Sequence, residues 1–224
     1  MEKYLSVLRE CPLFVGITDG DILRMLVCFG AKVEHFEKKQ TIISEGTRAK
    51  YIGIVLSGSV QVVQIDYYGN RSIIGNASRS QVFAEAFACA GVDNIPVDVI
   101  VGEDCEIMMI DSSHVMHTCG NHCGFHQRLI FNIMRDLAKK SIVFHKRMEI
   151  TAKRTTREKL LTYLALEAKD RGTSSFDIPF DRQELADYLE VDRSGLSSEI
   201  GKLRKAGILD SRKRHFKLLN VEER

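Results

Sequence analysis

The sequence predicts an α+β protein. We expect an N-terminal antiparallel β-roll (double-stranded β-helix or jelly-roll-like) with flanking helices, a long helix, and a C-terminal pair of short helices followed by a hairpin. Short apolar runs broken by turn signals such as Gly46, Gly58 and Gly69 fill residues 31–110, a pattern typical of a small roll or barrel. A three-four apolar spacing over 124–149 predicts the long helix. The expected domains are 1–123, 124–149 and 150–224.

The C-terminal helices are marked by their capping residues. Asp181 with Glu184 forms a capping box before the first helix, and Asp192 can cap a second helix over 193–205. Leu196, Ile200 and Leu203 then face inward, and the opposite face carries Arg193, Ser194, Ser197 and Ser198. This pattern predicts a helix-turn-helix whose second helix enters a DNA major groove. The alternative is an ordinary solvated helical hairpin.

A basic hairpin follows the second helix. Two short apolar runs flank a turn with Arg212, Lys213 and Arg214, which could lie along the DNA phosphates as the wing of a winged helix-turn-helix. Residues 145–224 hold 18 Lys and Arg against 14 Asp and Glu, whereas residues 1–144 hold 14 against 16. The predicted partner is double-stranded DNA, contacted by Arg182, Arg193, Ser194, Ser197, Ser198, Lys202, Arg212, Lys213 and Arg214.

The 224 residues carry a net charge of +2 and an ordinary share of apolar side chains. The sequence contains no apolar run of about 18 residues and no signal-peptide pattern at its start, so we expect a cytoplasmic protein without a membrane partner. The six cysteines are then expected to be reduced thiols.

The long helix carries a heptad-like seam of Ile130, Met134, Leu137, Ser141 and Phe144. We interpret it as a homodimer interface, because a dimeric helix-turn-helix protein needs a two-fold axis to match two half-sites. The alternative is a helix that only packs on its own domain.

Several stretches in this order carry a family resemblance. They are Pro12-Leu13-Phe14, the glycines at 46 and 58, Arg154-Thr155-Thr156-Arg157, and Arg182-Gln183-Glu184-Leu185-Ala186 with Arg193-Ser194. Along essentially its whole length the chain resembles the CRP/FNR family of bacterial transcription regulators. The resemblance implies a homodimer that senses a small-molecule signal in the roll and repositions its two DNA-binding domains on a palindromic site. RNA polymerase is then an expected partner if the protein activates transcription.

The resemblance also points to an effector pocket. Family members that bind cyclic AMP carry a Gly-Glu pair and, about ten residues later, an Arg that neutralises the phosphate. This chain has Ala84 before Glu85, and Ile95 stands where the Arg is expected. An unpaired phosphate in a partly buried pocket would be costly, so cyclic AMP is not expected. The matching pocket residues are Phe83, Ala84, Glu85, Ile95, Pro96 and Val97.

Cofactor signals lie elsewhere. An FNR-type iron-sulfur cluster is not expected, because only Cys11 and Cys28 lie in the N-terminal part of the chain and such clusters need four thiolates. Residues 114–126 instead concentrate histidines and cysteines. The spacing suggests a metal, a haem or redox-active thiols at Cys119 and Cys123, and the candidate metal ligands are Cys119, His122, Cys123 and His126. The alternative is simple packing of these side chains.

Two further functions compete with a regulated DNA-binding protein. One is a ligand-independent DNA-binding regulator with a degenerate roll, which the hydrophobic replacements at Ile95, Pro96 and Val97 favour. The other is a metal-dependent enzyme that uses the His/Cys cluster. That cluster lacks a Glu placed as a general base, and the sequence shows no phosphate loop or nucleophile elbow, so an enzyme is not expected.

Overall fold

The structure is a computed structural model and describes residues 1–69, 71–116 and 124–219. The chain forms two compact units, Met1–Ser141 and Ile142–Arg224. Their boundary falls inside helix α5 (Gly124–Thr151). The sequence had set 124–149 apart as a segment of its own, whereas the contacts assign the first part of this helix to one unit and its end to the other.

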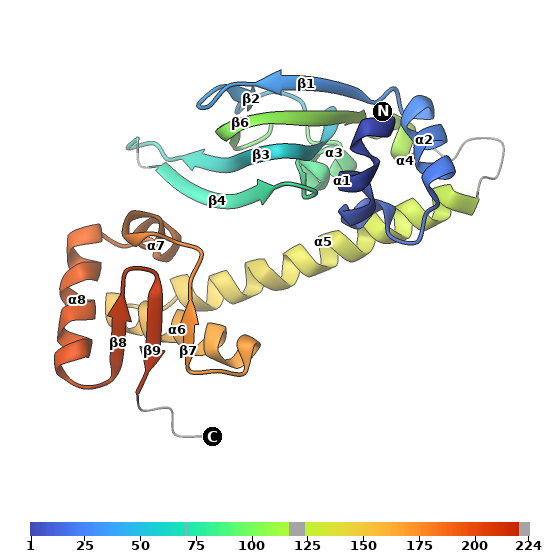
Figure 1. The fold of residues 1–224 in the computed structure, drawn as a ribbon. Helices are drawn as coiled ribbons and strands as arrows, with labels where there is room; N and C mark the ends of the chain where they lie inside the picture. Colours follow the sequence, from blue (N-terminus) through green and yellow to red (C-terminus); the bar gives the residue numbers. More distant parts are fainter. Residues whose placement is uncertain (70, 117–123, 220–224) are drawn as a thin grey trace. The chain divides into compact units, whose positions relative to one another are not determined.

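The first unit is built on an antiparallel sheet (Figure 1). Its strands are β1 (Lys32–Phe36), β2 (Thr41–Ile43), β3 (Tyr51–Ile65), β4 (Arg71–Ser78), β5 (Val82–Phe83) and β6 (Asp98–Asp111). They run in the order β1-β6-β3-β4, with β2 also paired to β6 and β5 to β3. The long strands β3 and β6 lie at the centre, so the sheet curls around them into the expected roll.

Alternate residues of the central strands supply two apolar cores. Ile52 and Ile54 of β3 pack in one cluster with the N-terminal helices, while Val55 belongs to a second cluster inside the roll. On β6, Met108 and Ile107 divide in the same way. Successive side chains of a strand point to opposite faces, so a strand that is apolar at consecutive positions is buried on both sides.

Gly58 does not make the turn that the sequence suggested. It lies within the continuous strand β3, at a point where the pairing register with β6 shifts, and its φ of +74° is in the left-handed region. A Cβ at this position would approach the Asp104 carbonyl oxygen to 2.2 Å. The glycine therefore forms a β-bulge that bends a long strand without ending it.

Short helices pack against one apolar core of the sheet. They are the 3₁₀ turns η1 (Glu2–Tyr4) and η2 (Pro12–Phe14), and the helices α1 (Leu5–Glu10), α2 (Asp19–Cys28), α3 (Glu85–Ala90) and α4 (Ser112–Met116). The first turns of α5 pack on this unit through the buried side chains of Leu129 and Ile133. Buried Asn132 donates hydrogen bonds from Nδ2 to the carbonyls of Leu13 and Val15, at 2.8 and 2.9 Å.

The second unit combines the end of α5 with α6 (Thr156–Arg171), β7 (Ser175–Asp177), α7 (Arg182–Leu189), α8 (Arg193–Lys205), β8 (Leu209–Arg212) and β9 (His215–Leu218). The three strands form one sheet in the order β7-β9-β8. The sequence predicted the β8–β9 hairpin but not β7, which has only three residues. Within the described residues, no helix is both long and apolar enough to cross a membrane.

Candidate nucleic-acid interface and sensor segment

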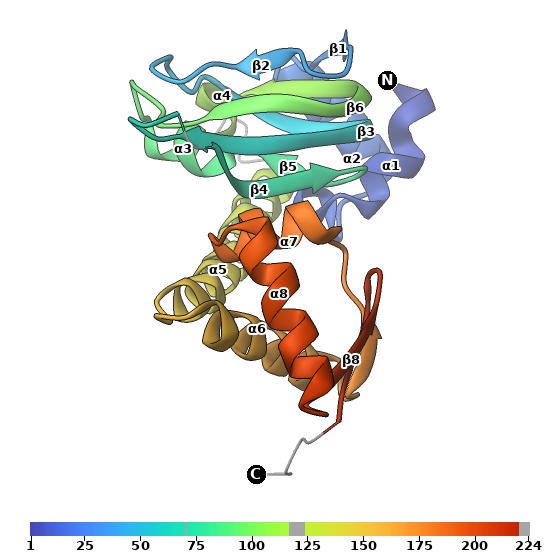
Figure 2. The ribbon, with the colours of Figure 1, turned by 90° about the vertical axis from the view of Figure 1, so that its left-hand side faces the viewer.

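Helices α7 and α8, which are labelled in Figure 2, begin directly after the predicted caps Asp181 and Asp192. Asp181 Oδ1 accepts a hydrogen bond from Glu184 N at 2.9 Å, and Asp181 N donates to Glu184 Oε2 at 2.6 Å, which completes the capping box. Asp192 Oδ2 accepts from Gly195 N at 2.8 Å. Both helix starts are therefore satisfied locally, and α8 begins at Arg193 as predicted.

The turn between the two helices is fixed from behind. α7 ends at Leu189, and the next residue, Glu190, caps it with a left-handed φ of +53°. Lys159 of α6 donates from Nζ to the carbonyls of Leu189 and Glu190, at 3.1 and 3.2 Å. Arg147 of α5 lies over the Tyr188 ring, 5.1 Å from its centroid, and 3.7 Å from a Glu190 carboxylate oxygen. These cations neutralise the carbonyl end of α7 and hold the turn in one conformation.

Helix α8 separates a buried face from a polar face. Leu196, Ile200 and Leu203 are at most 4% exposed and pack in the core of the second unit. The four residues predicted to read DNA, Arg193, Ser194, Ser197 and Ser198, are all exposed. The Ser194 hydroxyl also donates to Asp192, so it shares in the helix cap. The small side chains leave room for a base edge to approach the helix backbone.

Arg182 is less free than the sequence suggested. It is the first residue of α7 and is half-buried, with its guanidinium over the ring of Phe216, 5.5 Å from the centroid. Its Nη1 is buried without a hydrogen-bond partner among the described residues. Burial, and then the positive charge of Arg193, lower the pKa of Arg182. An anion beside Arg182 would give its guanidinium a hydrogen-bond partner and would offset the repulsion from Arg193. A DNA phosphate would be an anion of this kind.

The basic turn predicted for the wing is present between β8 and β9. Arg212, Lys213 and Arg214 are exposed, and Lys213 takes the left-handed conformation of a tight turn with a φ of +56°. Arg214 Nη2 lies 3.8 Å from Glu184 Oε2, so the wing also contacts the start of α7. Lys202, the last predicted contact, is exposed on α8 and pairs with Glu199 at 3.3 Å.

The predicted effector segment lies in the first unit, around β5 and α3. Phe83, Ile95 and Val97 are at most 3% exposed, while Pro96 is exposed. Ile95 exchanges backbone hydrogen bonds with the Gly46 turn, donating to Thr47 O and accepting from Gly46 N. Ala84 has a φ of +61°, in the left-handed region that favours glycine. At the position where the family has an Arg, this chain therefore has an apolar side chain packed into the core.

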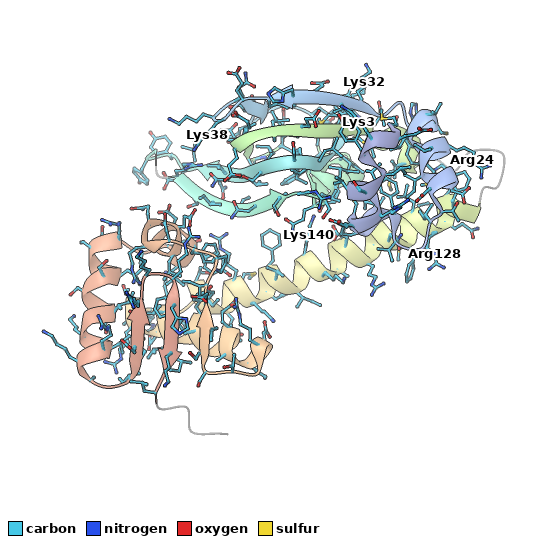
Figure 3. The ribbon with its side chains drawn as sticks, viewed as in Figure 1. Lys3, Arg24, Lys32, Lys38, Arg128 and Lys140 are labelled. Atoms are coloured by element: carbon cyan, nitrogen blue, oxygen red, sulfur yellow. The ribbon has the colours of Figure 1, made fainter. Side chains whose placement is uncertain are left out.

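Glu85 has a partner that the sequence analysis did not identify. The carboxylate is buried, and its Oε1 lies 2.6 Å from Nζ of Lys140 on α5. Lys140 Nζ also donates to Val82 O at 2.8 Å and lies 3.0 Å from Asp136 Oδ2 (Figure 3 labels Lys140). The available signal was the pair of charges at 136 and 140, one turn apart on a face that is otherwise apolar at Leu129 and Ile133.

The candidate metal ligands can be described only in part. Cys119, His122 and Cys123 lie outside the described residues. His126 lies in the first turn of α5 and is 3% exposed, and neither of its ring nitrogens has a hydrogen-bond partner among the described residues. Its ring meets Phe29 edge-on with the centroids 5.3 Å apart. Within the described ranges, no group of three or more His, Cys, Asp or Glu side chains could hold a metal ion.

The predicted dimer residues differ in how far they are exposed on α5. Met134 is 60% and Phe144 52% exposed, and Ser141 is exposed as well. Ile130 and Leu137 are half-buried, and Leu137 packs against the core of its own unit. Further exposed apolar side chains on the helix are Phe131, Ile142, Val143 and Met148.

Comparisons with known proteins agree with this architecture. Residues 33–122 match the cyclic nucleotide-binding domain and residues 158–223 the Crp-like helix-turn-helix domain. The transcriptional activator protein FnrL of Cereibacter sphaeroides is 24% identical over 186 residues, covering 78% of this chain and 71% of that protein. These matches cover both units.

Solved structures show the same fold. FixK2 from Bradyrhizobium japonicum aligns with a TM-score of 0.60 and 21% identity, over 85% of this chain and 93% of that one. The c-di-GMP responsive global regulator CLP of Xanthomonas campestris aligns with a TM-score of 0.69 and 18% identity, over 91% and 100%. With a cyclic nucleotide-binding domain followed by a Crp-like helix-turn-helix domain, this chain belongs to the CRP/FNR family of transcription regulators.

Proposed function

We propose that the protein binds a palindromic DNA operator as a homodimer, with α8 in the major groove and the β8–β9 wing along the phosphates. The observation that carries this proposal is α8 itself. Its start is capped by Asp192, one face is buried through Leu196, Ile200 and Leu203, and the other exposes Arg193 beside three serines. Side chains this short allow the helix backbone to approach base edges closely.

The exposed apolar side chains of α5 support the homodimer. Phe131, Met134, Phe144 and Met148 are each more than half exposed on a single helix. Large apolar side chains that a helix leaves exposed in this number are typical of a protein–protein interface. A second copy of the same helix, related by a two-fold axis, would cover it and would present two α8 helices to two half-sites.

The regulating signal is proposed to be a small molecule, a metal or a redox change sensed by the first unit, and not cyclic AMP. Ile95, at the position of the phosphate-binding Arg, is buried, and the Lys140 ammonium is already paired with Glu85. His126 supports the metal or haem option, because a buried imidazole without a partner is costly unless a ligand satisfies it. Its companions would be Cys119, His122 and Cys123, and a thiol pair at Cys119 and Cys123 could act in a redox switch instead.

A ligand-independent regulator is the second candidate. The observation that favours it is the packing of Phe83, Ile95 and Val97 into the protein core. On this alternative the operator would be bound equally with and without any effector. In either case RNA polymerase would be a partner if the bound dimer activates transcription.

The test is selection of DNA from a random library by the purified protein. We expect an enriched inverted repeat, and a solution mass of twice 25.4 kDa by light scattering. A monomeric mass, or enrichment of no inverted repeat, would contradict the proposal. Metal content and the absorption spectrum of anaerobically purified protein test whether the His/Cys cluster binds a metal or a haem. Bound metal or a haem band that is lost when Cys119 and Cys123 are changed to Ser would assign the sensor to this cluster.

A further inference from the structure

The cluster around Lys140 joins three segments of the first unit. The Lys140 ammonium on α5 donates hydrogen bonds to Glu85 Oε1 on α3 at 2.6 Å and to the Val82 carbonyl on β5 at 2.8 Å. Asp136, one turn earlier on α5, lies 3.0 Å away, close enough for an ion pair but not aligned for a hydrogen bond. One ammonium therefore connects the long helix to the segment that ends β5 and begins α3.

Lys140 is the cation that pairs with the two carboxylates of this cluster. The Glu85 and Asp136 side chains are only 4% and 11% exposed, whereas the Lys140 side chain is 38% exposed and reaches solvent. The neighbouring Cys11 and Cys89 thiols stay neutral and add no charge to the cluster. Burial raises the pKa of Cys11 to about 12, and burial and then the Glu85 charge raise the pKa of Cys89. Without Lys140, two buried carboxylates would face each other unpaired, an arrangement far more costly than the intact ion pair.

Helix α3 depends on tertiary contacts of this kind. It has six residues, and its N-cap Ala84 makes no side-chain capping hydrogen bond and takes a left-handed φ of +61°. A helix of this length is not stable by itself in water. Glu85 is its first residue, so the ion pair with Lys140 acts where an isolated α3 would unwind first.

We infer that Lys140 is a positioning residue whose ammonium holds helix α3 on helix α5. It does this at the predicted effector segment, so no bound effector is needed to keep the two helices together. A ligand that acts at this point must bring its own cationic group to displace the ammonium from Glu85, Asp136 and the Val82 carbonyl. An anionic ligand would leave these oxygens unpaired. This cation-selective contact is a property of the first unit alone. Its effect on DNA binding rests on the function proposed above.

Hydrogen exchange of the full-length protein tests the inference without DNA. Lys140→Ala should lower the protection of the hydrogen-bonded amides of α3, from Ala88 to Ala90, at least tenfold, because the first amides of a helix have no partner within it. Lys139→Ala, a change at an exposed lysine on the same helix, should leave this protection unchanged. Glu85→Gln keeps the side-chain size and should lower protection in the same segment. Wild-type protection of this segment in Lys140→Ala would overturn the inference.

Chemical rescue separates the ammonium from a general packing effect. Propylammonium has the size of the atoms that Lys140→Ala removes, and the partly exposed site leaves a route from solvent. It should restore protection of α3 in Lys140→Ala, whereas propanol or sodium chloride at the same concentration should not. Equal rescue by propanol, or none by propylammonium, would contradict the charge-based role.

Operator affinity is measured on the same variants. Lys140→Ala should change affinity relative to wild type and Lys139→Ala should not. If the wild-type protein binds no operator at all, the proposed function fails, while the exchange and rescue results still decide the role of Lys140.

Discussion

Replacing Arg193 with Ala tests how α8 meets DNA. Arg193 is the first residue of α8, is exposed, and lies close enough to Arg182 to lower the pKa of that guanidinium. A contact to phosphate contributes about 0.9 to the slope of log affinity against log salt, so loss of one contact in each half-site should reduce that slope by about 1.8. A contact to guanine would instead cost about 1–3 kcal/mol per half-site and relax specificity at one base.

Binding to the selected operator, measured by fluorescence anisotropy between 50 and 200 mM salt, distinguishes the two modes. Lys205→Ala is the matched control, because Lys205 is exposed at the far end of the same helix. Lys205→Ala should leave the base specificity unchanged and should alter the slope of log affinity against log salt only slightly. If Arg193→Ala leaves both affinity and salt slope at their wild-type values, the proposed docking of α8 is wrong.

Three further perturbations test how the structure is held together. Gly53→Ala would place a Cβ 2.1 Å from the buried Phe83 ring, so we expect the first unit to lose about 1–3 kcal/mol of stability in thermal unfolding. An unchanged melting temperature would contradict this packing. Lys159→Met should cost the second unit about 1–2 kcal/mol in urea unfolding by removing two charge-assisted bonds to the end of α7, while the exposed Arg157→Met should cost little. Burial raises the pKa of Cys11 to about 12, so the stability that its neutral thiol contributes is complete below about pH 9 and is lost as the pH rises toward 12. Cys11→Ala should therefore make the free energy of unfolding fall less steeply between these pH values. An equal fall in both proteins would refute this assignment.

Local signals explain why the second unit was the more predictable. Asp192 and the spacing of Leu196, Ile200 and Leu203 define α8, and the structure has the same bounds, Arg193–Lys205. Capping and helical periodicity act within four residues, so the sequence contains them directly. Strand β7 was missed because three residues show no periodicity, and it exists through its pairing with β9.

In the first unit the sequence predicted the class of fold but not the features that depend on contacts between residues far apart in the chain. Gly58 suggested a turn, but its role as a bulge is set by the pairing of β3 with β6, more than 40 residues later. Glu85 was recognised as a candidate effector residue, yet its partner Lys140 is 55 residues away on another element. No local pattern specifies such a pair, and only the packing of α5 against the roll brings the two charges together.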